Sequence, residues 1–177
     1  MTDAVVATGL VAPVVLIDGP AGAGKSTLAD DLVAHWPTRI RPSLVRMDDI
    51  YPGWEGLTAG SEFLYADLLA PLRSGRPAGW RRYDWALGER ADWHPIDQAA
   101  PLIVEGCGTL TGACAALADV RVWLDADDDV RKKRALARDH GGFDPFWDIW
   151  QEQFERFVET ERPTWRADLL LDGTALR

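Results

Sequence analysis

The feature that most limits the fold of this chain is the run GPAGAGKS at residues 19–26, which matches the pattern G-x-x-x-x-G-K-[ST]. An apolar run at residues 14–17 precedes it, and a stretch with helical character begins at Ser26. A glycine-rich loop between a strand and a helix lets successive backbone amides surround phosphate oxygens, and the helix N-terminus adds positive potential. The pattern therefore predicts a phosphate-binding loop in an α/β fold.

Two side chains of this loop have distinct expected roles. Lys25 is expected to reach the β- and γ-phosphates of a nucleoside triphosphate, and the Ser26 hydroxyl to join the ligands of Mg²⁺. The residues that we expect to hold the nucleotide are Gly19, Ala21, Gly22, Ala23, Gly24, Lys25, Ser26 and Thr27. A glycine-rich turn with a chance lysine is the competing interpretation, and the strand before the loop and the helix after it argue against it.

Short apolar runs alternate with helical stretches along the chain. Continuous apolar runs suit strands that are buried on both faces of a sheet, and the alternation predicts parallel pairing through right-handed crossovers. We expect strands in residues 14–17, 44–47, 102–104, 120–124 and 169–171, and helices in residues 26–36, 63–72, 129–139 and 146–161. The predicted fold class is α/β: a three-layer P-loop NTPase fold with a five-stranded parallel sheet, helices on both faces and a small helical lid.

The length of 177 residues fits one domain with a full core. Hydrophobic residues make up 47% and charged residues 27% of the chain, which excludes a disordered chain and a membrane bundle. Residues 52–95 are rich in Gly, Pro and Trp, where an open α/β sheet carries substrate-binding excursions. We expect a core in residues 14–51 and 101–174, an acceptor-binding excursion in residues 52–95, and a lid at about residues 131–146.

The net charge and the cysteines limit the binding partners and the cellular compartment that we expect for this chain. With 28 acidic against 19 basic residues, the formal charge of -9 would repel a nucleic acid at long range. No apolar run reaches the length of a membrane span, and no export signal is recognisable. Cys107 and Cys114 form neither a disulfide framework nor a zinc pattern. We therefore expect a cytoplasmic protein that acts on a small molecule and binds neither nucleic acid nor membrane.

Two predicted strands end in a carboxylate that could complete a metal site. Glu105 follows residues 102–104, where an acid can hold the water shell of a metal ion beside the phosphates. Asp125 follows residues 120–124 in the same way, so the residues alone leave both acids open. Because a helix follows Asp125 directly, we interpret the acids at residues 127–129 as caps of that helix. Glu105 is thus our second candidate for the metal site, beside Ser26.

Asp48 and Asp49 close the second predicted strand. The carboxyl ends of parallel strands meet at one edge of a sheet, so these acids are expected to face the same crevice as the glycine-rich loop. One of them can take the proton from an acceptor hydroxyl while the other points away. A one-residue shift exchanges the two, so both stay open, and a solvated acidic turn is the alternative interpretation.

Arg131, Arg134 and Arg138 are spaced so that all three lie on one face of a predicted helix. In an acidic protein such a face is typical of a phosphate clamp, which stabilises the charge on a transferring phosphoryl group. The glycines at residues 141–142 would supply the hinge of a closing lid, and His140 beside them is a further candidate. An exposed arginine stripe without function is the alternative.

The aromatic residues fall into two groups. A stripe at helical spacing predicts a core face and consists of Phe146, Trp150, Gln153, Phe154, Phe157 and Val158. The aromatic residues from Trp80 to Trp93 suggest a flat or apolar acceptor, because rings supply stacking area at low entropic cost. Plain packing of an irregular segment is the competing interpretation of this second group.

In order and spacing, these motifs resemble the uridine kinase-like branch of the P-loop small-molecule kinases. The resemblance covers about residues 14–174. It rests on the glycine-rich loop, on DDIY at 48–51, YDW at 83–85, EG at 105–106, R-x-x-R-x-x-x-RD at 131–139 and RPT at 162–164. For this chain it implies Asp48 as general base, Ser26 and Glu105 around Mg²⁺, Tyr51, Tyr83, Trp85 and Arg90 on the acceptor side, and Arg134 and Arg138 as lid arginines acting with Lys25.

The chain departs from that branch on the acceptor side. Members typically carry an Asp-His-Pro-Asp-like run that holds the ribose hydroxyls, where this chain has TAGSE at residues 58–62. Uridine kinases have a histidine at the position of Gly88, and they have further lid arginines where this chain has HGGF at residues 140–143. The phosphoryl-donor half therefore matches the branch more completely than the acceptor half does.

The resemblance implies an ATP-dependent kinase that uses Mg²⁺ and transfers the γ-phosphoryl group to a hydroxyl of a small molecule, with a nucleoside as the first candidate. Two alternatives stay open. One is a kinase for a nucleoside monophosphate, a sugar or a vitamin precursor, in which Arg81, Arg82 and Arg90 could meet a phosphorylated acceptor. The other is a P-loop ATPase or nucleotide switch that acts on a protein partner.

Overall fold

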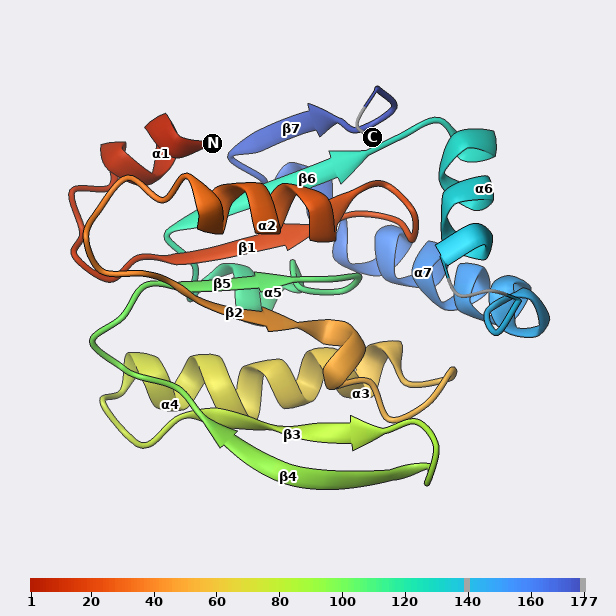
Figure 1. The fold of residues 1–177 in the computed structure, drawn as a ribbon, viewed down its shortest axis with the longest axis horizontal. Helices are drawn as coiled ribbons and strands as arrows, with labels where there is room; N and C mark the ends of the chain where they lie inside the picture. The colour runs from red at the N-terminus through yellow and green to blue at the C-terminus, as the bar shows by residue number, and fades with distance from the viewer. Residues whose placement is uncertain (139–140, 176–177) are drawn as a thin grey trace.

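The computed structural model describes residues 1–138 and 141–175. Its main sheet has five parallel strands in the order β2-β5-β1-β6-β7 (Figure 1). These strands are β1 (Val14–Asp18), β2 (Ser43–Arg46), β5 (Leu102–Glu105), β6 (Val120–Asp125) and β7 (Leu169–Asp172). Each of them falls on one of the predicted apolar runs, so the predicted α/β fold with a five-stranded parallel sheet is confirmed.

Helices connect the strands and cover both faces of the sheet. The helices and helical turns are α1 (Thr2–Ala7), α2 (Lys25–Ala34), the 3₁₀ turn η1 (Met47–Asp49), α3 (Leu57–Phe63), the π-helix η2 (Leu64–Leu69), α4 (Ala70–Arg73), α5 (Gly112–Ala115), α6 (Asp128–Arg138), the 3₁₀ turn η3 (Asp144–Phe146), α7 (Trp147–Glu161) and the 3₁₀ turn η4 (Pro163–Trp165). None of the helices in the described part of the chain is both long and apolar enough to span a bilayer.

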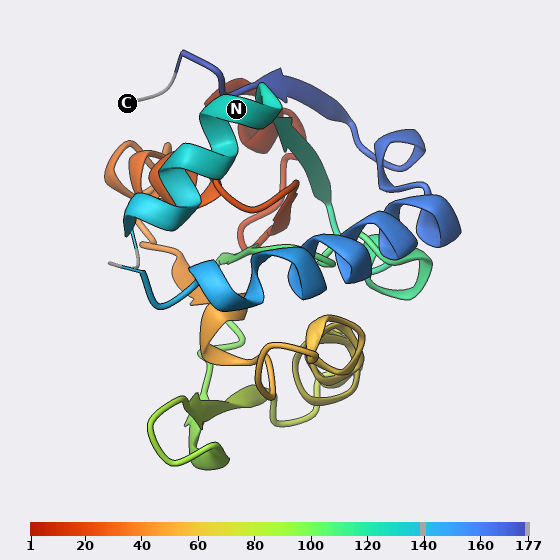
Figure 2. The same cartoon turned by 90° about the vertical axis from the view of Figure 1, so that its right-hand side faces the viewer.

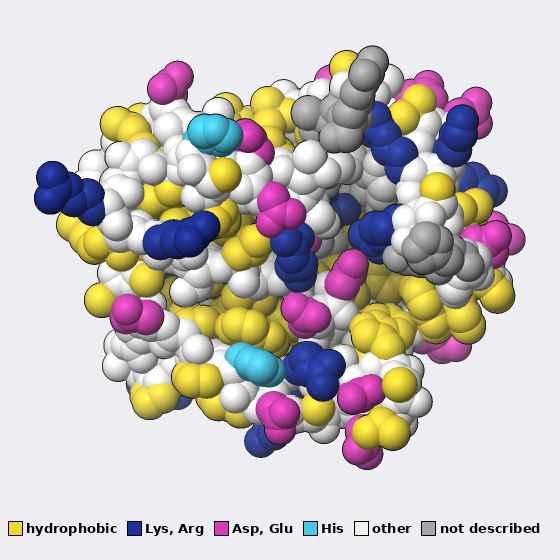
Figure 3. Space-filling model, in the orientation of Figure 1, with side chains coloured by type: hydrophobic (Ala, Val, Ile, Leu, Met, Phe, Trp, Pro, Cys, Tyr) yellow, Lys and Arg dark blue, Asp and Glu magenta, His cyan; other side chains and the backbone are white. Residues whose placement is uncertain are grey.

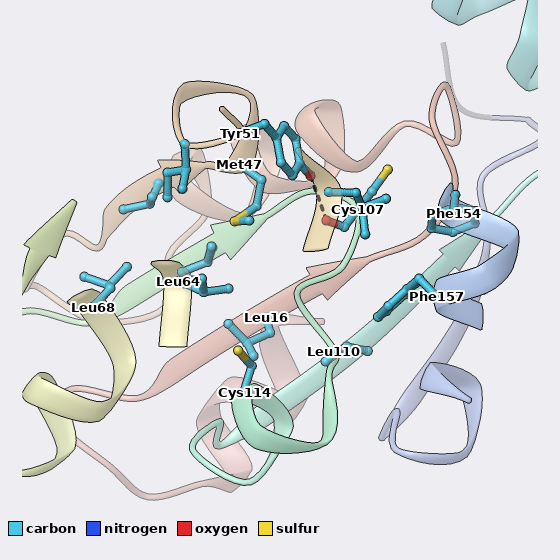
Figure 4. Packing of buried hydrophobic residues seen from close by; sticks show 14 of the residues in the cluster. Leu16, Met47, Tyr51, Leu64, Leu68, Cys107, Leu110, Cys114, Phe154 and Phe157 are labelled. Carbon is cyan, nitrogen blue, oxygen red and sulfur yellow. Dashed lines mark hydrogen bonds between the residues drawn. The ribbon is translucent and has the colours of Figure 1, made fainter. Parts of the chain in front are cut away.

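The central strand β1 contributes to two separate cores. Successive side chains of a strand point to opposite faces of the sheet. Ile17 packs in the cluster on the α2 side, whereas Leu16 packs in the larger cluster with α7, and Figure 2 shows these two helices on opposite sides of the sheet. Figure 4 shows part of the larger cluster, including Leu16 of the sheet, Leu110 and Phe157 of α7. Burial on both faces explains why the strands are continuously apolar.

Helix α7 supplies most of the predicted aromatic core stripe. Trp150, Phe154 and Phe157 are buried, and Val158 packs against them. Phe146 differs from the prediction, because it lies in η3 before the helix and is 37% exposed. The other exception is Gln153, whose polar side chain has hydrogen bonds to the loop before α3.

The register of the sheet brings three chain segments to one edge. Ile17 of β1 and Arg46 of β2 both pair with Glu105 of β5, so the three strands end level with one another. Parallel strands present their carboxyl ends at the same edge. The glycine-rich loop, Glu105 and the turn that contains Asp48 therefore emerge side by side.

Residues 52–95 are more regular than the sequence suggested. The chain forms a helical stretch from α3 through η2 to α4 and then an antiparallel hairpin of β3 (Gly79–Asp84) and β4 (Glu89–Pro95). The hairpin forms a second, two-stranded sheet at the lower end of the molecule, and β3 lies against η1 and η2 (Figures 1 and 2). These strands were not predicted from the sequence, because many of their residues are charged or exposed and neither of the two segments contains an apolar run.

Candidate active site

A cavity of about 560 Å³ lies at the carboxyl ends of β1, β2 and β5. Its walls come from the glycine-rich loop, from η1 and the segment after it, from the segment after β5, from α6, and from α7 with the residues before it. In Figure 3, Lys and Arg side chains surround a hollow beside α6, and hydrophobic side chains lie below it. The edge of the sheet that the sequence marked as the site is thus concave, with cations beside an apolar wall.

The glycine-rich loop lines one wall of the cavity. The loop residues that line the cavity are Ala21, Gly22, Gly24, Lys25, Ser26 and Thr27. Two predicted nucleotide-binding residues lie behind it: the Gly19 carbonyl accepts a hydrogen bond from Lys25, and Ala23 is buried against Leu124. Gly22 has a φ of 79°, and a Cβ there would collide with the Arg131 carbonyl oxygen, so only glycine fits at this position.

Lys25 is held close to the loop. Its side chain is nearly buried, and Nζ donates hydrogen bonds of 2.8 Å to the carbonyl oxygens of both Gly19 and Pro20. The Cys107 thiol lies 3.6 Å from the same nitrogen. The ammonium therefore stands at the floor of the cavity, within the loop whose amides would bind phosphates.

Ser26 and Glu105 form the candidate metal pair. The Ser26 hydroxyl donates a hydrogen bond of 3.0 Å to Glu105 Oε1, which also accepts one of 3.2 Å from Arg46. Burial raises the pKa of Glu105, and the nearby Lys25 ammonium opposes this rise. Hydroxyl and carboxylate oxygens suit Mg²⁺, which usually keeps several waters and binds phosphates. In the described part of the chain no cluster of three or more His, Cys, Asp or Glu competes as a metal site.

The alternative carboxylate, Asp125, lies elsewhere. It does not line the cavity, and its Oδ1 accepts the backbone amide of Ala126. Asp127 accepts the amides of Asp129 and Val130 at the start of α6, so the predicted capping role of this acidic group is confirmed. The geometry therefore favours Glu105 over Asp125.

The two adjacent acids of η1 have different surroundings. Asp48 lines the cavity, and its Oδ2 lies 3.5 Å from Arg138 Nη2. Asp49 does not line the cavity, and burial together with the neighbouring Asp48 charge raises its pKa. The geometry therefore favours Asp48 as the acid that faces the glycine-rich loop.

The predicted three-arginine face is divided between two environments. Arg134 and Arg138 line the cavity, and Arg134 also donates to the Gly173 and Thr174 carbonyl oxygens at 2.9 and 2.8 Å. Arg131 is 7% exposed and does not line the cavity. It donates to Asp128 at 2.7 Å and to Gln151 of α7 at 3.0 Å, so it fastens α6 to α7. The expectation of a clamp of three arginines on one face is thus wrong for Arg131. The candidate His140 lies outside the described residues.

An aromatic wall faces the loop across the cavity. It consists of Tyr51, Trp54, Trp85, Phe143 and Trp150. The Tyr51 hydroxyl donates to the Cys107 carbonyl oxygen at 2.7 Å (Figure 4), and Trp85 Nε1 donates to the Asp48 carbonyl oxygen at 2.9 Å. Two of the predicted acceptor residues, Tyr51 and Trp85, therefore belong to the cavity.

The other two predicted acceptor residues lie outside the cavity. Tyr83 meets the edge of Trp85 with ring centroids 5.3 Å apart, so it supports the wall from behind. Arg90 pairs with Asp67 at 2.9 Å and lies 3.9 Å from the centre of the Phe63 ring. The structure therefore does not bring Arg90 to the cavity.

The sequence analysis missed several residues that shape the site. Asp18 is fully buried at the end of β1 and accepts the backbone amides of Gly19, Gly108 and Leu110 at 2.7 to 3.0 Å. Burial raises its pKa to about 6. An acid between a buried strand and the glycine-rich loop is a visible signal for it. Nothing in the sequence marked Cys107 as a cavity residue, whereas Trp54 beside Gly53 was one of several tryptophans for which a lining role competed with packing.

Comparisons with known proteins agree with this arrangement. No protein-family model matches the chain. Curated uridine kinases from several strains of Streptococcus pneumoniae are 26% identical over 143 residues, which cover 72% of this chain and 67% of the relative. A solved structure described as a possible uridine kinase from Bacillus stearothermophilus matches with a TM-score of 0.66 and 20% identity, over 92% of this chain and 90% of that chain.

A second solved structure has the same fold. It is a proposed fructose transport system kinase from Silicibacter sp. TM1040, with a TM-score of 0.55, 17% identity and 96% coverage of each chain. The curated relatives and the shared fold confirm the resemblance found in the sequence. In sequence and in fold, the chain is therefore similar to uridine kinases.

Proposed function

We propose that this chain is an ATP-dependent kinase that transfers the γ-phosphoryl group to a hydroxyl of a small molecule, with a nucleoside as the first candidate. The proposal rests on a cavity that brings the glycine-rich loop, the Ser26–Glu105 pair and the Asp48 carboxylate together. A carboxylate that faces a phosphate-binding loop would repel the phosphates. Its presence there is best explained by an acceptor hydroxyl that needs a base.

The proposed reaction gives each side chain a defined task. The acceptor oxygen bonds to the γ-phosphorus, its proton passes to the Asp48 carboxylate, and the bond from that phosphorus to the bridging oxygen of ADP breaks. Lys25, Arg134 and Arg138 stabilise the charge on the phosphoryl oxygens. Mg²⁺, when held by Ser26 and Glu105, neutralises further phosphate charge.

The central test is the substitution Asp48→Asn. We expect it to lower ATP turnover with the best acceptor by at least about a hundredfold, because general-base catalysis typically contributes about 10²- to 10⁴-fold. ADP release in the presence of ATP, Mg²⁺ and a panel of nucleosides measures the effect. Circular dichroism and the thermal midpoint check that the variant is folded.

Asp49→Asn is the matched control. It removes the neighbouring carboxylate, which does not line the cavity, and we expect turnover within about threefold of the original. If the Asp49 variant lost activity while the Asp48 variant kept it, the assignment of the base would be reversed. Near-normal turnover in both variants would remove the acid from the proposed mechanism.

The structure weakens one alternative acceptor class. A nucleoside monophosphate would need cations on the acceptor side, but Arg81 donates to the Ala91 carbonyl oxygen, Arg82 pairs with Asp84, and Arg90 pairs with Asp67. Sugars are tested as acceptors beside the nucleosides, because the Silicibacter structure is named for fructose transport. ATP hydrolysis that does not depend on any acceptor would favour the ATPase or switch alternative. Cytoplasmic location stays a prediction.

A further inference from the structure

In the aromatic wall of the cavity, the polar atoms of Tyr51 and Trp85 already have partners. The Tyr51 hydroxyl and the Trp85 indole nitrogen both donate to backbone carbonyl oxygens, at 2.7 and 2.9 Å. Burial raises the pKa of the Cys107 thiol, and the neighbouring Trp150 side chain opposes this rise. A ligand against this wall therefore meets ring faces and edges, and it finds few free donors or acceptors there.

Ring stacking connects the two sides of this wall. Trp54 lies between η1 and α3 and stacks on Phe143, with centroids 5.1 Å apart and planes 12° apart, and on Phe146 of η3 at 4.7 Å and 8°. Its ring also meets Trp85 at 4.8 Å. Aromatic pairs at these separations stabilise one another. The wall is therefore a continuous apolar surface built from two distant chain segments.

Helix α3, which lies behind Tyr51, adds no polar group to the cavity. Gly60 packs so closely on the Tyr51 ring that a Cβ would come within 2.6 Å of it. The Ser61 hydroxyl is buried, donates to the Gly108 carbonyl oxygen at 2.8 Å and lies 3.1 Å from the Leu57 carbonyl oxygen. No residue from 58 to 62 lines the cavity. The helix supports the aromatic wall and leaves ligand hydroxyl groups without a partner from this side.

The charged groups on the acceptor side are few. Outside the glycine-rich loop, the charged residues that line the cavity in the described part of the chain are Asp48, Glu105, Arg134 and Arg138. Glu105 is engaged by Ser26 and Arg46, and Asp48 lies 3.5 Å from Arg138. One carboxylate is thus placed to receive one hydroxyl group.

From these observations we infer that the acceptor is an uncharged planar compound with a primary hydroxyl group, selected by contact with rings and by Asp48, and that the site does not read the two secondary hydroxyls of a ribose. This inference rests on the proposed kinase function. It predicts that a nucleoside is accepted for its flat base and its primary hydroxyl, so that related compounds without a diol are accepted equally well.

Uridine and 2′,3′-dideoxyuridine form the decisive pair of acceptors, since they share the base and the primary hydroxyl and differ in the diol. We expect their kcat/KM values to agree within about tenfold, whereas a site built to hydrogen-bond a substrate hydroxyl rejects the analogue without it by about 10⁴-fold. A loss larger than tenfold for the dideoxy compound overturns the inference and leaves the proposed kinase function intact. Transfer to sugars but to no planar compound does the same, and transfer to no acceptor at all removes both.

Variants of Trp85 test the wall itself. Trp85→Leu removes the ring, and we expect kcat/KM for uridine to fall by about 5- to 160-fold, since stacking of a base on a ring is worth about 1 to 3 kcal/mol. Trp85→Phe keeps a ring but loses the hydrogen bond to the Asp48 carbonyl oxygen. If stacking is what matters, the kcat/KM of this variant for uridine should stay within about threefold of the original. Equal activity of the Leu and Phe variants would overturn the role of the ring.

Trp93→Leu is the matched control for Trp85→Leu. Trp93 and Trp85 are each 41% exposed, and both belong to the hairpin region, but Trp93 does not line the cavity. We expect Trp93→Leu to leave kcat/KM for uridine unchanged. An equal loss in both tryptophan variants would show a general effect on the hairpin and would count against the inference.

Discussion

Asp18 shows how one buried carboxylate can organise two loops. It is fully buried where β1 ends, and it accepts backbone amides from the glycine-rich loop and from the segment that follows Glu105. Loss of solvation raises its pKa to about 6, although the hydrogen bonds and the Lys25 charge act in the opposite direction. The same group that fixes the phosphate-binding loop should therefore titrate near neutral pH.

This titration predicts how stability depends on pH. The ordinary pKa is 3.8 and the folded value is about 6, so between these values the folded chain keeps a proton that the unfolded chain releases. The contribution of Asp18 to the free energy of unfolding is thus fully present below pH 3.8 and is lost as the pH rises through 6. Over this window the loss amounts to about 2 to 3 kcal/mol.

Comparison with Asp18→Asn isolates this effect from other acids. Urea unfolding at several pH values gives the difference in free energy of unfolding between the original protein and the variant. We expect this difference to shift in favour of the original protein as the pH falls from 7 to 4. A difference that stays constant, or that shifts toward the variant, would contradict the assignment.

At the scale of elements, the N-terminal part of α6 is attached to its neighbours in the fold, and its C-terminal end reaches the acceptor side of the cavity. Arg131 joins it to α7, and Arg134 joins it to the carbonyl oxygens after β7. The Arg131 carbonyl oxygen contacts Gly22 so closely that no Cβ fits between them. Closure of α6 as a rigid lid would break these contacts, so we expect the part of α6 from Arg131 to Arg134 to stay in place on binding.

The contact between Gly22 and α6 yields a test by substitution. Gly22→Ala should force α6 away from the glycine-rich loop and lower the affinity for ATP by at least about tenfold, because the new methyl group meets backbone that cannot rotate away. Isothermal titration with ATP and Mg²⁺ measures the loss.

Gly9→Ala controls for backbone strain in this experiment. Gly9 also has a positive φ, 66° against 79° for Gly22, but a Cβ there would meet nothing within 4 Å. It should cost about 1 kcal/mol of stability and leave ATP affinity unchanged. Equal affinities of the two variants would show that the contact with α6 does not matter.

The elements also show what the sequence could and could not reveal. The five strands of the main sheet were predictable, because burial on both faces leaves an apolar run in each. The β3–β4 hairpin was not, because its strands pair with each other and expose residues such as Arg81 and Glu89. Spacing placed Arg131 on the face of Arg134, but it could not show that Asp128 and Gln151 would hold its guanidinium.

At the scale of the whole molecule, the distribution of charge matters more than its sum. The chain has a formal charge of -9, yet Lys25, Arg134 and Arg138 all line the cavity, and Figure 3 shows basic side chains beside the hollow. The acidic surface repels a nucleoside triphosphate at long range, and the basic side chains at the cavity attract it at short range. Mg²⁺ reduces the charge of a triphosphate, so it should favour binding for this reason as well.

This predicts that ATP stabilises the fold only together with Mg²⁺ and Lys25. At a ligand concentration of about 100 times Kd the gain is about 2.7 kcal/mol, which corresponds to roughly 5 to 10 °C in the thermal midpoint for a chain of this size. Differential scanning fluorimetry with ATP and Mg²⁺, with ATP and EDTA, and with Lys25→Ala measures the shift. Equal shifts in all three conditions would contradict specific binding at the glycine-rich loop.

Because β1, β5 and β2 end at the same level, the sheet determines the distance across which the phosphoryl group is transferred. Ile17, Glu105 and Arg46 lie in one row, and neighbouring strands are about 4.8 Å apart. The span from the phosphate loop to Asp48 is therefore set by two strand spacings, about 10 Å, and not by any loop. Evolution or design can replace the acceptor-binding excursion in residues 52–95 to admit a new acceptor. The hydroxyl group of that acceptor must still bind at the same position relative to the ends of these three strands.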